Sequence, residues 1–229
     1  MTFNGQNGII LIVLLIKYEH TFGTNIKSFG GIIMAHQIVD LNCPGCGARV
    51  TTEQTECMYC HNPVIISTFN SVNNMSMPQL NKYASEYRKA LEENPDNTDL
   101  NNSVAMCYLK LNLYDKAISA FEKAIEDNFD NSQTYFYAAI SLLKGQKPYY
   151  HMRETIDKAM EYLNAAVQIE PLGIYYFFMA YIKKDYFERK FLNVPPSSME
   201  LLMMAKQAGT SPYDITQLFA ILKTENPFF

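Results

Sequence analysis

Four of the five cysteines lie close together in the chain, in two CxxC pairs. Cys43 and Cys46 form the first pair and Cys57 and Cys60 the second, with ten residues between the pairs. A CxxC turn can bring two thiolates onto one ion while backbone N–H groups point at the sulfurs, and two such turns complete a tetrahedral shell with Zn–S distances near ~2.3 Å. The spacing therefore predicts a metal centre without an open coordination position, which indicates a structural role rather than a catalytic one.

The residues beside the cysteines suit tight turns. Gly45 and Gly47 supply backbone freedom at the first pair. His61 and Asn62 hold the matching positions at the second pair, and both residue types tolerate left-handed geometry better than most. We expect two similar turns. His61 is not expected as a ligand, since four thiols already fill the shell.

Other uses of paired cysteines fit less well. A redox-active CxxC pair belongs in a βαβ setting, and nothing in this sequence alternates in that way. Disulfides suit a secreted chain, whereas cytosolic thiols stay reduced. Iron in a rubredoxin-like site uses the same four ligands, so the sequence favours Zn²⁺ but leaves iron, and with it an electron carrier, open.

Residues 43–61 resemble the short zinc ribbons found at the N-termini of bacterial multidomain proteins. The resemblance rests on CPGCG, the ten-residue spacer and CMYCH, and His61 departs from it because those ribbons usually carry Gly at that position. It implies a small β zinc ribbon over residues 34–66. About thirty residues cannot bury a sufficient core alone, and structural zinc contributes on the order of 10 kcal/mol to the folding of such a domain.

The elements that follow the ribbon are predicted to be a linker and a helical array. Residues 67–79 are rich in Asn and Ser, which is typical of a linker. From Leu80 onward helical periodicity continues with few breaks. The 34-residue segment 98–131 resembles a tetratricopeptide repeat (TPR), a helix–turn–helix unit with small and large residues at fixed places. The places matched here are Val104, Ala105, Tyr108, Ala117, Phe121 and Ala124.

Further degenerate copies surround this segment. The second copy departs by an insertion of about eight residues around Tyr149, and the first departs by carrying Asn101 where the repeat usually has a large aromatic residue. The matched positions of the other copies are Tyr83, Tyr87, Ala90, Pro95, Tyr135, Ala138, Ala139, Leu142, Ala159, Leu163, Ala166, Pro171, Tyr176, Met179 and Ala180. The expected fold is mainly α, a TPR-like α-solenoid of antiparallel helix pairs over residues 80–195. Two capping helices are expected over residues 196–229, with start signals at Ser197 and Ser211 and a stop at Gly209.

The resemblance to TPR proteins also implies where a partner would bind. The first helix of each repeat contributes a stripe to the inner face of such an array, which commonly takes peptides or helices. Transferring the register places six residues on this stripe: Asn102, Met106, Phe136, Ile140, Phe177 and Tyr181. TPR domains that hold acidic chaperone tails use Lys, Arg and Asn there, and only Asn102 fits. Two interpretations stay open, a buried core covered by the C-terminal helices or tail, and an exposed apolar groove for a partner helix or peptide.

Composition and charge exclude several other functions. The net charge of −4 and the pI near 5.6 argue against a general polyanion binder. The ribbon segment contains the basic residue Arg49 and the acidic residues Asp40, Glu53 and Glu56. Its net charge therefore has the wrong sign for binding nucleic acid. The sequence has no glycine-rich phosphate loop and no GxSxG, and its histidines fall in no recognisable catalytic motif. We therefore expect a protein that is not an enzyme.

The first 33 residues contain an aliphatic run between Gly8 and Lys17. The run is far shorter than the ~20 residues that span a bilayer, and no basic residue precedes it as in a signal peptide. Two glycines just before Met34 would be encoded by purine-rich codons where a bacterial ribosome-binding site lies. We therefore expect the natural start at Met34, with a membrane-targeting segment or a structured extension as the alternatives.

Together these features predict a cytoplasmic bacterial adaptor, in which a structural zinc ribbon precedes a TPR array that binds a protein or peptide partner. Nucleic acid is not expected as a partner. A membrane is not expected either, unless residues 1–33 are part of the native protein. One alternative is a zinc-ribbon regulatory or nucleic-acid-associated factor whose helices serve as scaffold. The second is a rubredoxin-like electron carrier.

Overall fold

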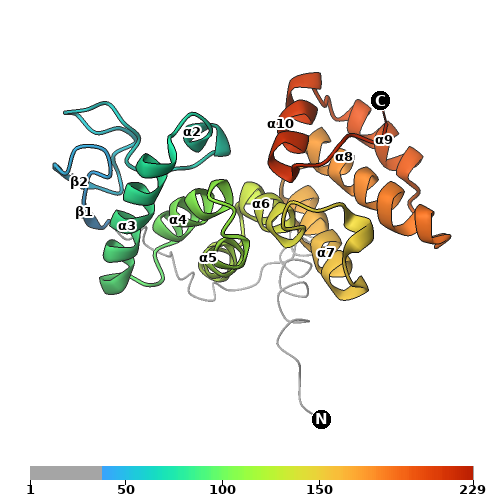
Figure 1. The fold of residues 1–229 in the computed structure, drawn as a ribbon, viewed down its shortest axis with the longest axis horizontal. Coiled ribbons are helices and arrows are strands. Elements are labelled where there is room, and N and C mark those ends of the chain that lie inside the picture. The colour runs from blue at the N-terminus through green and yellow to red at the C-terminus, as the bar shows by residue number, and fades with distance from the viewer. Residues whose placement is uncertain (1–37, 229) are drawn as a thin grey trace, which may run out of the picture. The chain divides into compact units, whose positions relative to one another are not determined.

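The computed structural model describes residues 38–228. The chain divides into two units, Met1–His36 and Gln37–Phe229, and the second contains every element described below (Figure 1). The expected start at Met34 and the doubtful leader 1–33 lie outside the described residues.

The N-terminal part is a small β ribbon, here taken as residues 38–66. Strand β1 (Asp40–Asn42) pairs antiparallel with β2 (Arg49–Thr51), with Leu41 opposite Val50. Both central side chains are buried, while their strand neighbours are exposed or half-buried, as expected for short strands with one face on a core. This confirms the small β element expected before the helices.

The polar segment predicted as a linker contains a short helix. Helix α2 (Phe69–Asn73) buries Phe69 and Val72, and the next helix begins at Met77. Two apolar residues among Asn and Ser give too little periodicity to predict a helix. The helix is held by tertiary contacts, including a stacked pair formed by Phe69 and Tyr137 with ring centroids 5.9 Å apart.

The rest of the chain is an array of helices. In chain order the long helices are α3 (Met77–Glu93), α4 (Thr98–Lys110), α5 (Tyr114–Asp127), α6 (Ser132–Leu142), α7 (Arg153–Ile169), α8 (Gly173–Ile182), α9 (Ser198–Gln207) and α10 (Pro212–Leu222). From α3 to α9 each helix packs against the next one in the chain. The fold is therefore mainly α, with stacked helix pairs and a two-stranded sheet near its N-terminal end, as predicted.

Small residues permit the close approach of paired helices. Ala105 of α4, Ala117 of α5, Ala138 of α6 and Ala159 of α7 have no exposed surface. A larger side chain at such a position would force the helices apart, because protein interiors are close-packed. These four predicted positions thus lie in the packed interior of the array, whereas Pro95 and Pro171, also predicted from the repeat pattern, are exposed.

Asparagines begin successive repeats. Asn97 accepts the backbone N–H of Leu100 as the N-cap of α4, and Asn131 does the same for Gln133 and Thr134 at α6. These residues lie one repeat apart and satisfy N–H groups that a helix start leaves without a partner.

Asn101, the departure from the repeat pattern, is buried and satisfied. Its amide donates to the carbonyls of Pro95 at 2.8 Å and Asn97 at 3.1 Å. It ties the α3–α4 turn to α4 by hydrogen bonds in place of an aromatic side chain.

The second half of the chain contains irregular turns. The inserted residues between α6 and α7 include the 3₁₀ turn η1 (Pro148–Tyr150). Helix α8 continues into a π turn, η2 (Lys183–Phe187), and a 3₁₀ turn, η3 (Glu188–Lys190). The buried Asp185 carboxylate accepts the N–H of Tyr149 and a bond from Arg189, which ties η2 to the insertion.

Both C-terminal helices begin with capping boxes. Ser197 pairs with Glu200 at α9, and Ser211 pairs with Asp214 at α10. Gly209 adopts a positive φ of 83° between them, as expected for a helix stop. Among residues 38–228, no helix combines the length and the hydropathy needed to cross a bilayer.

Candidate metal centre and the buried stripe

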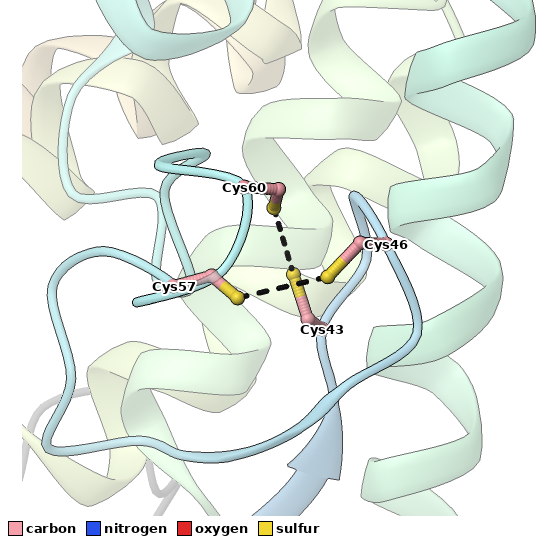
Figure 2. A group of neighbouring side chains, drawn as sticks. All are labelled: Cys43, Cys46, Cys57 and Cys60. Atoms are coloured by element: carbon pink, nitrogen blue, oxygen red, sulfur yellow. Dashed lines mark hydrogen bonds between the residues drawn. The ribbon is translucent and has the colours of Figure 1, made fainter.

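The fold brings the four ribbon thiols together. Figure 2 shows them converging from two opposed turns, with Cys43 Sγ 3.6 Å from Cys60 Sγ and Cys46 Sγ 3.7 Å from Cys57 Sγ. All four sulfurs lie within 4.8 Å of one another. A tetrahedral shell with metal–sulfur distances of about 2.3 Å has edges of about 3.8 Å. The arrangement could therefore hold a metal ion.

The two cysteine turns share one backbone pattern. The N–H of Gly47 donates to the Cys43 carbonyl, and that of His61 donates to the Cys57 carbonyl, both at 2.8 Å. The N–H of each leading cysteine then donates to a carbonyl five residues further on, at 2.7 Å for Ala48 and 2.9 Å for Asn62. The two turns are thus matched, as the sequence predicted.

Left-handed backbone is needed at the same place in both turns. Gly47 has φ of 85° and His61 has φ of 56°. His61 therefore occupies a position that suits glycine, and histidine tolerates the left-handed conformation there better than most residues. Gly45 is restricted by space instead, because a Cβ there would lie 2.6 Å from Asn62 Nδ2 and 3.0 Å from Cys60 Sγ.

The surroundings of the sulfurs favour thiolates on the second turn. A backbone N–H bond from Asn62 lowers the pKa of Cys60 to about 6. A backbone bond from Tyr59 likewise lowers the pKa of Cys57. Burial raises the pKa of Cys43 to about 12. Thiolates are the form that binds metal, so the N–H donors to Cys57 and Cys60 support metal binding. In the absence of a metal ion, burial opposes the ionisation of Cys43.

Two tyrosines of α3 hold the ribbon on the array. Tyr83 and Tyr87 were predicted as repeat positions, and their side chains are buried. Their hydroxyls also donate to ribbon carbonyls, Tyr83 to Pro63 at 3.2 Å and Tyr87 to Val64 at 2.8 Å. No pattern in the sequence indicates this second role, because the acceptors are backbone atoms distant in the chain.

A second contact fixes the end of the ribbon. The N–H of Ile66 donates to Ser103 Oγ of α4 at 2.9 Å, and at the other side Lys82 Nζ donates to the Gly45 carbonyl at 2.5 Å. Ser103 has no exposed surface. The ribbon and the first helices therefore form one continuous packed structure.

All six residues predicted on the inner stripe are buried. The exposed fraction ranges from 1% for Ile140 and Tyr181 to 8% for Asn102. Ile65 and Ile66 lie beside Asn102 and Met106, around a small cavity of about 40 Å³.

The stripe is covered at its other end as well. The Phe219 ring of α10 lies 6.3 Å from that of Phe177 and 5.1 Å from that of Tyr181. The sequence left open whether the stripe is a covered core or an exposed groove. In this structure the stripe is covered. Partner binding through the stripe stays a prediction.

Comparison with known families supports the repeat pattern. Residues 84–143, which run from α3 to the end of α6, match the family model of the tetratricopeptide repeat. A search of curated proteins found no match. The resemblance predicted from the sequence is thus confirmed for this segment, and TPR segments point to protein–protein interaction. The thiol cluster points to metal binding.

Proposed function

We propose that this chain is an adaptor, in which a zinc-stabilised ribbon is fixed to the start of a TPR array that binds a partner helix or peptide. The observation that carries the proposal is the joined pair of modules: a TPR segment at residues 84–143 and a four-thiol cluster docked on it through α3 and α4.

Zn²⁺ with a structural role suits the thiol cluster best. Four sulfurs at tetrahedral spacing suit Zn²⁺, and they leave no coordination position for a substrate. Cys43 and Cys57 are fully buried, so the centre lies within the ribbon core rather than in a cleft. A cytoplasmic location agrees with cysteines kept as thiols.

Metal analysis of the purified protein tests this part. We expect one zinc per chain by elemental mass spectrometry and a colourless solution. A red protein with one iron per chain would support the rubredoxin-like electron carrier instead.

The array, rather than the ribbon, is proposed to bind the partner. Stacked helix pairs present extended surfaces that take helices or peptides. The ribbon carries Arg49 against Asp40, Glu53 and Glu56, so it lacks the positive surface that nucleic acid requires.

Partner capture with mapping tests this assignment. The full chain would be used to capture partners from its own cell extract, and hydrogen exchange would then locate the contact. We expect changes in exchange on the helices of the array, α3 to α10, rather than on the ribbon. Protection confined to residues 38–66, together with bound RNA or DNA, would favour the zinc-ribbon regulatory or nucleic-acid-associated factor.

A further inference from the structure

Helix α10 does not continue the stacking of the array. Each helix from α3 to α9 packs against the next, but α10 packs chiefly on α8, two helices back in the chain (Figure 1). Repeats in a solenoid bury their faces against neighbours in sequence. A helix that turns back in this way covers the array instead of extending it.

The surface that α10 covers is the C-terminal end of the predicted stripe. Besides the contacts of Phe219 with Phe177 and Tyr181, the Tyr181 hydroxyl bonds Thr224 Oγ1 at 3.0 Å. In the tail, the Phe228 ring lies 5.5 Å from that of Phe177. The cover thus consists of residues 211–228.

Helix α10 has the amphipathic form of a ligand that lies in a groove. Its buried residues are Leu218, Phe219 and Leu222, whereas Thr216 and Ala220 are exposed. A helix that presents one apolar face to a groove is a common mode of peptide recognition. The chain therefore supplies such a helix to its own stripe.

Polar contacts close this cover against the first repeat. Asn73, at the end of α2, accepts a bond from Lys110 Nζ at 2.9 Å and donates through Nδ2 to Gln217 Oε1 of α10 at 3.1 Å. Because an ammonium group only donates, Asn73 must turn its oxygen to Lys110 and its NH₂ to Gln217. Gln217 is therefore required as an acceptor.

A second polar contact lies at the other end of α10. Lys223 Nζ donates to Asn112 Oδ1 at 2.5 Å, in the turn after α4. Both contacts join residues more than one hundred positions apart. They are single hydrogen bonds with exposed or half-buried partners, so each adds only modest stability.

The chain around α10 suits movement of the helix as a unit. Its capping box at Ser211 and Asp214, with Pro212 at the first position, stabilises the helix locally. The preceding Gly209 has positive φ and open space around its Cβ position. Next to the helix, an open hollow of about 840 Å³ runs between Lys147, Tyr150 and Phe219, where a partner would first make contact.

We propose that residues 211–228 are an intramolecular ligand of the stripe, which an amphipathic partner helix of the same Leu-Phe-x-x-Leu chemistry displaces. The proposal rests on the proposed adaptor function and names the kind of partner. Such a device makes binding depend on opening, because apparent affinity is reduced by the fraction of molecules that are closed.

A fluorescent peptide of residues 211–228 tests this with the full chain. The informative variants are Gln217→Lys, which replaces the acceptor with a donor, and Gln217→Glu, which keeps the acceptor. We expect Gln217→Lys to bind the peptide about fivefold more tightly than wild type, as for loss of one hydrogen bond, and Gln217→Glu to bind like wild type. Lys223→Met, at the other contact, provides a second variant with the same expectation. Thermal melts verify that all variants fold.

Hydrogen exchange then locates the peptide. Bound peptide should raise exchange in the protein's own α10 while α8 stays protected, and a peptide carrying Phe219→Asp should not bind.

The proposal is overturned by equal binding to Gln217→Lys and Gln217→Glu, by no binding to Gln217→Lys and Lys223→Met, or by binding without exposure of α10. Partner capture by a protein whose α10 never opens would leave the adaptor function intact. Displacement of α10 without any partner from the extract would count against the adaptor function alone.

Discussion

His61 shows how one backbone angle limits the choice of residue in the ribbon. Its φ of 56° matches the glycine conformation of Gly47 in the first turn. A β-branched residue fits this region poorly, whereas His is several-fold enriched there, so His61 escapes part of the roughly 1–2 kcal/mol that the left-handed conformation costs a non-glycine residue. We expect His61→Val to lower the free energy of unfolding of the metal-loaded ribbon by about 1–2 kcal/mol, measured by chemical denaturation.

His61→Gly serves as the control for this substitution. It removes the same imidazole but accepts positive φ, so we expect stability close to that of wild type. Equal losses in both variants would show that the imidazole itself, rather than the backbone, stabilises the turn.

Cys60 and Cys43 should differ in reactivity once metal is removed. The pKa of Cys60 is lowered to about 6 by the Asn62 N–H, and that of Cys43 is raised to about 12 by burial. An unfolded thiol has a pKa of about 8.5. Because the folded-state pKa of Cys60 is lower, its ionisation stabilises the fold fully above pH 8.5, and this stabilisation is lost as the pH falls through about 6. We expect alkylation of Cys60 by iodoacetamide to rise through pH 6 and to be nearly complete at pH 8, with Cys43 unreacted.

Peptide mass spectrometry of the alkylated chain separates the two thiols, and the metal-loaded protein provides the unreactive control. If both cysteines react with the pH profile of an ordinary thiol, the backbone N–H groups do not tune the centre.

At the scale of elements, the sequence predicted the helices that follow the repeat pattern or carry local capping signals. It did not predict the elements that are stabilised by contacts between residues far apart in the chain. The alanines at helix interfaces and the caps of α9 and α10 follow from local spacing, so these helices could be predicted. Helix α2 and the π turn η2 could not, because their stabilising contacts, such as Phe69 with Tyr137 and Asp185 with the N–H of Tyr149, join residues far apart in the chain. A local pattern contains no record of such contacts.

The junction of α8 and α9 depends on the absence of a side chain at Gly173. A Cβ there would lie 2.6 Å from the Ala205 carbonyl oxygen and 2.8 Å from the Thr210 nitrogen. Since both are backbone atoms, a helix would have to shift. We expect Gly173→Ala to destabilise the array by about 1–3 kcal/mol in urea unfolding.

Gly209→Asn is the matched control near the same junction. Its Cβ position has no atom within 4 Å, and Asn tolerates positive φ better than most residues. We expect a smaller loss than for Gly173→Ala, because the substitution strains only the backbone conformation and creates no close contact. A stable Gly173→Ala protein would mean that α8 and α9 can separate slightly at no cost.

For the whole molecule, the main feature that the sequence could not predict is the joining of its parts. The thiol cluster and the repeat pattern were each clear from spacing, whereas the residues of the stripe were assigned by transferring the register of the TPR resemblance. Whether the stripe is open depends on where α2 and α10 come to lie, and these positions are set by side chains such as Phe219 and Gln217 that show no periodic signal of their own. Folding of the ribbon onto α3 likewise depends on backbone acceptors.

The ribbon and the array should therefore respond to metal together. The Tyr87 hydroxyl, fully buried, donates to the Val64 carbonyl at 2.8 Å. Loss of a donor that leaves a buried carbonyl unsatisfied costs about 1–3 kcal/mol. In wild type we expect removal of metal by a chelator to destabilise the ribbon and to lower the melting temperature of the helices, because ligand binding stabilises whatever is coupled to the bound state. In Tyr87→Phe the metal-loaded protein should melt lower, and the further drop on chelation should be smaller.

Circular dichroism of the helices measures both values, and Tyr213→Phe, an exposed tyrosine of α10, provides the control with wild-type behaviour. An equal drop on chelation in Tyr87→Phe and wild type would show that this hydrogen bond does not transmit the stability of the metal centre to the array.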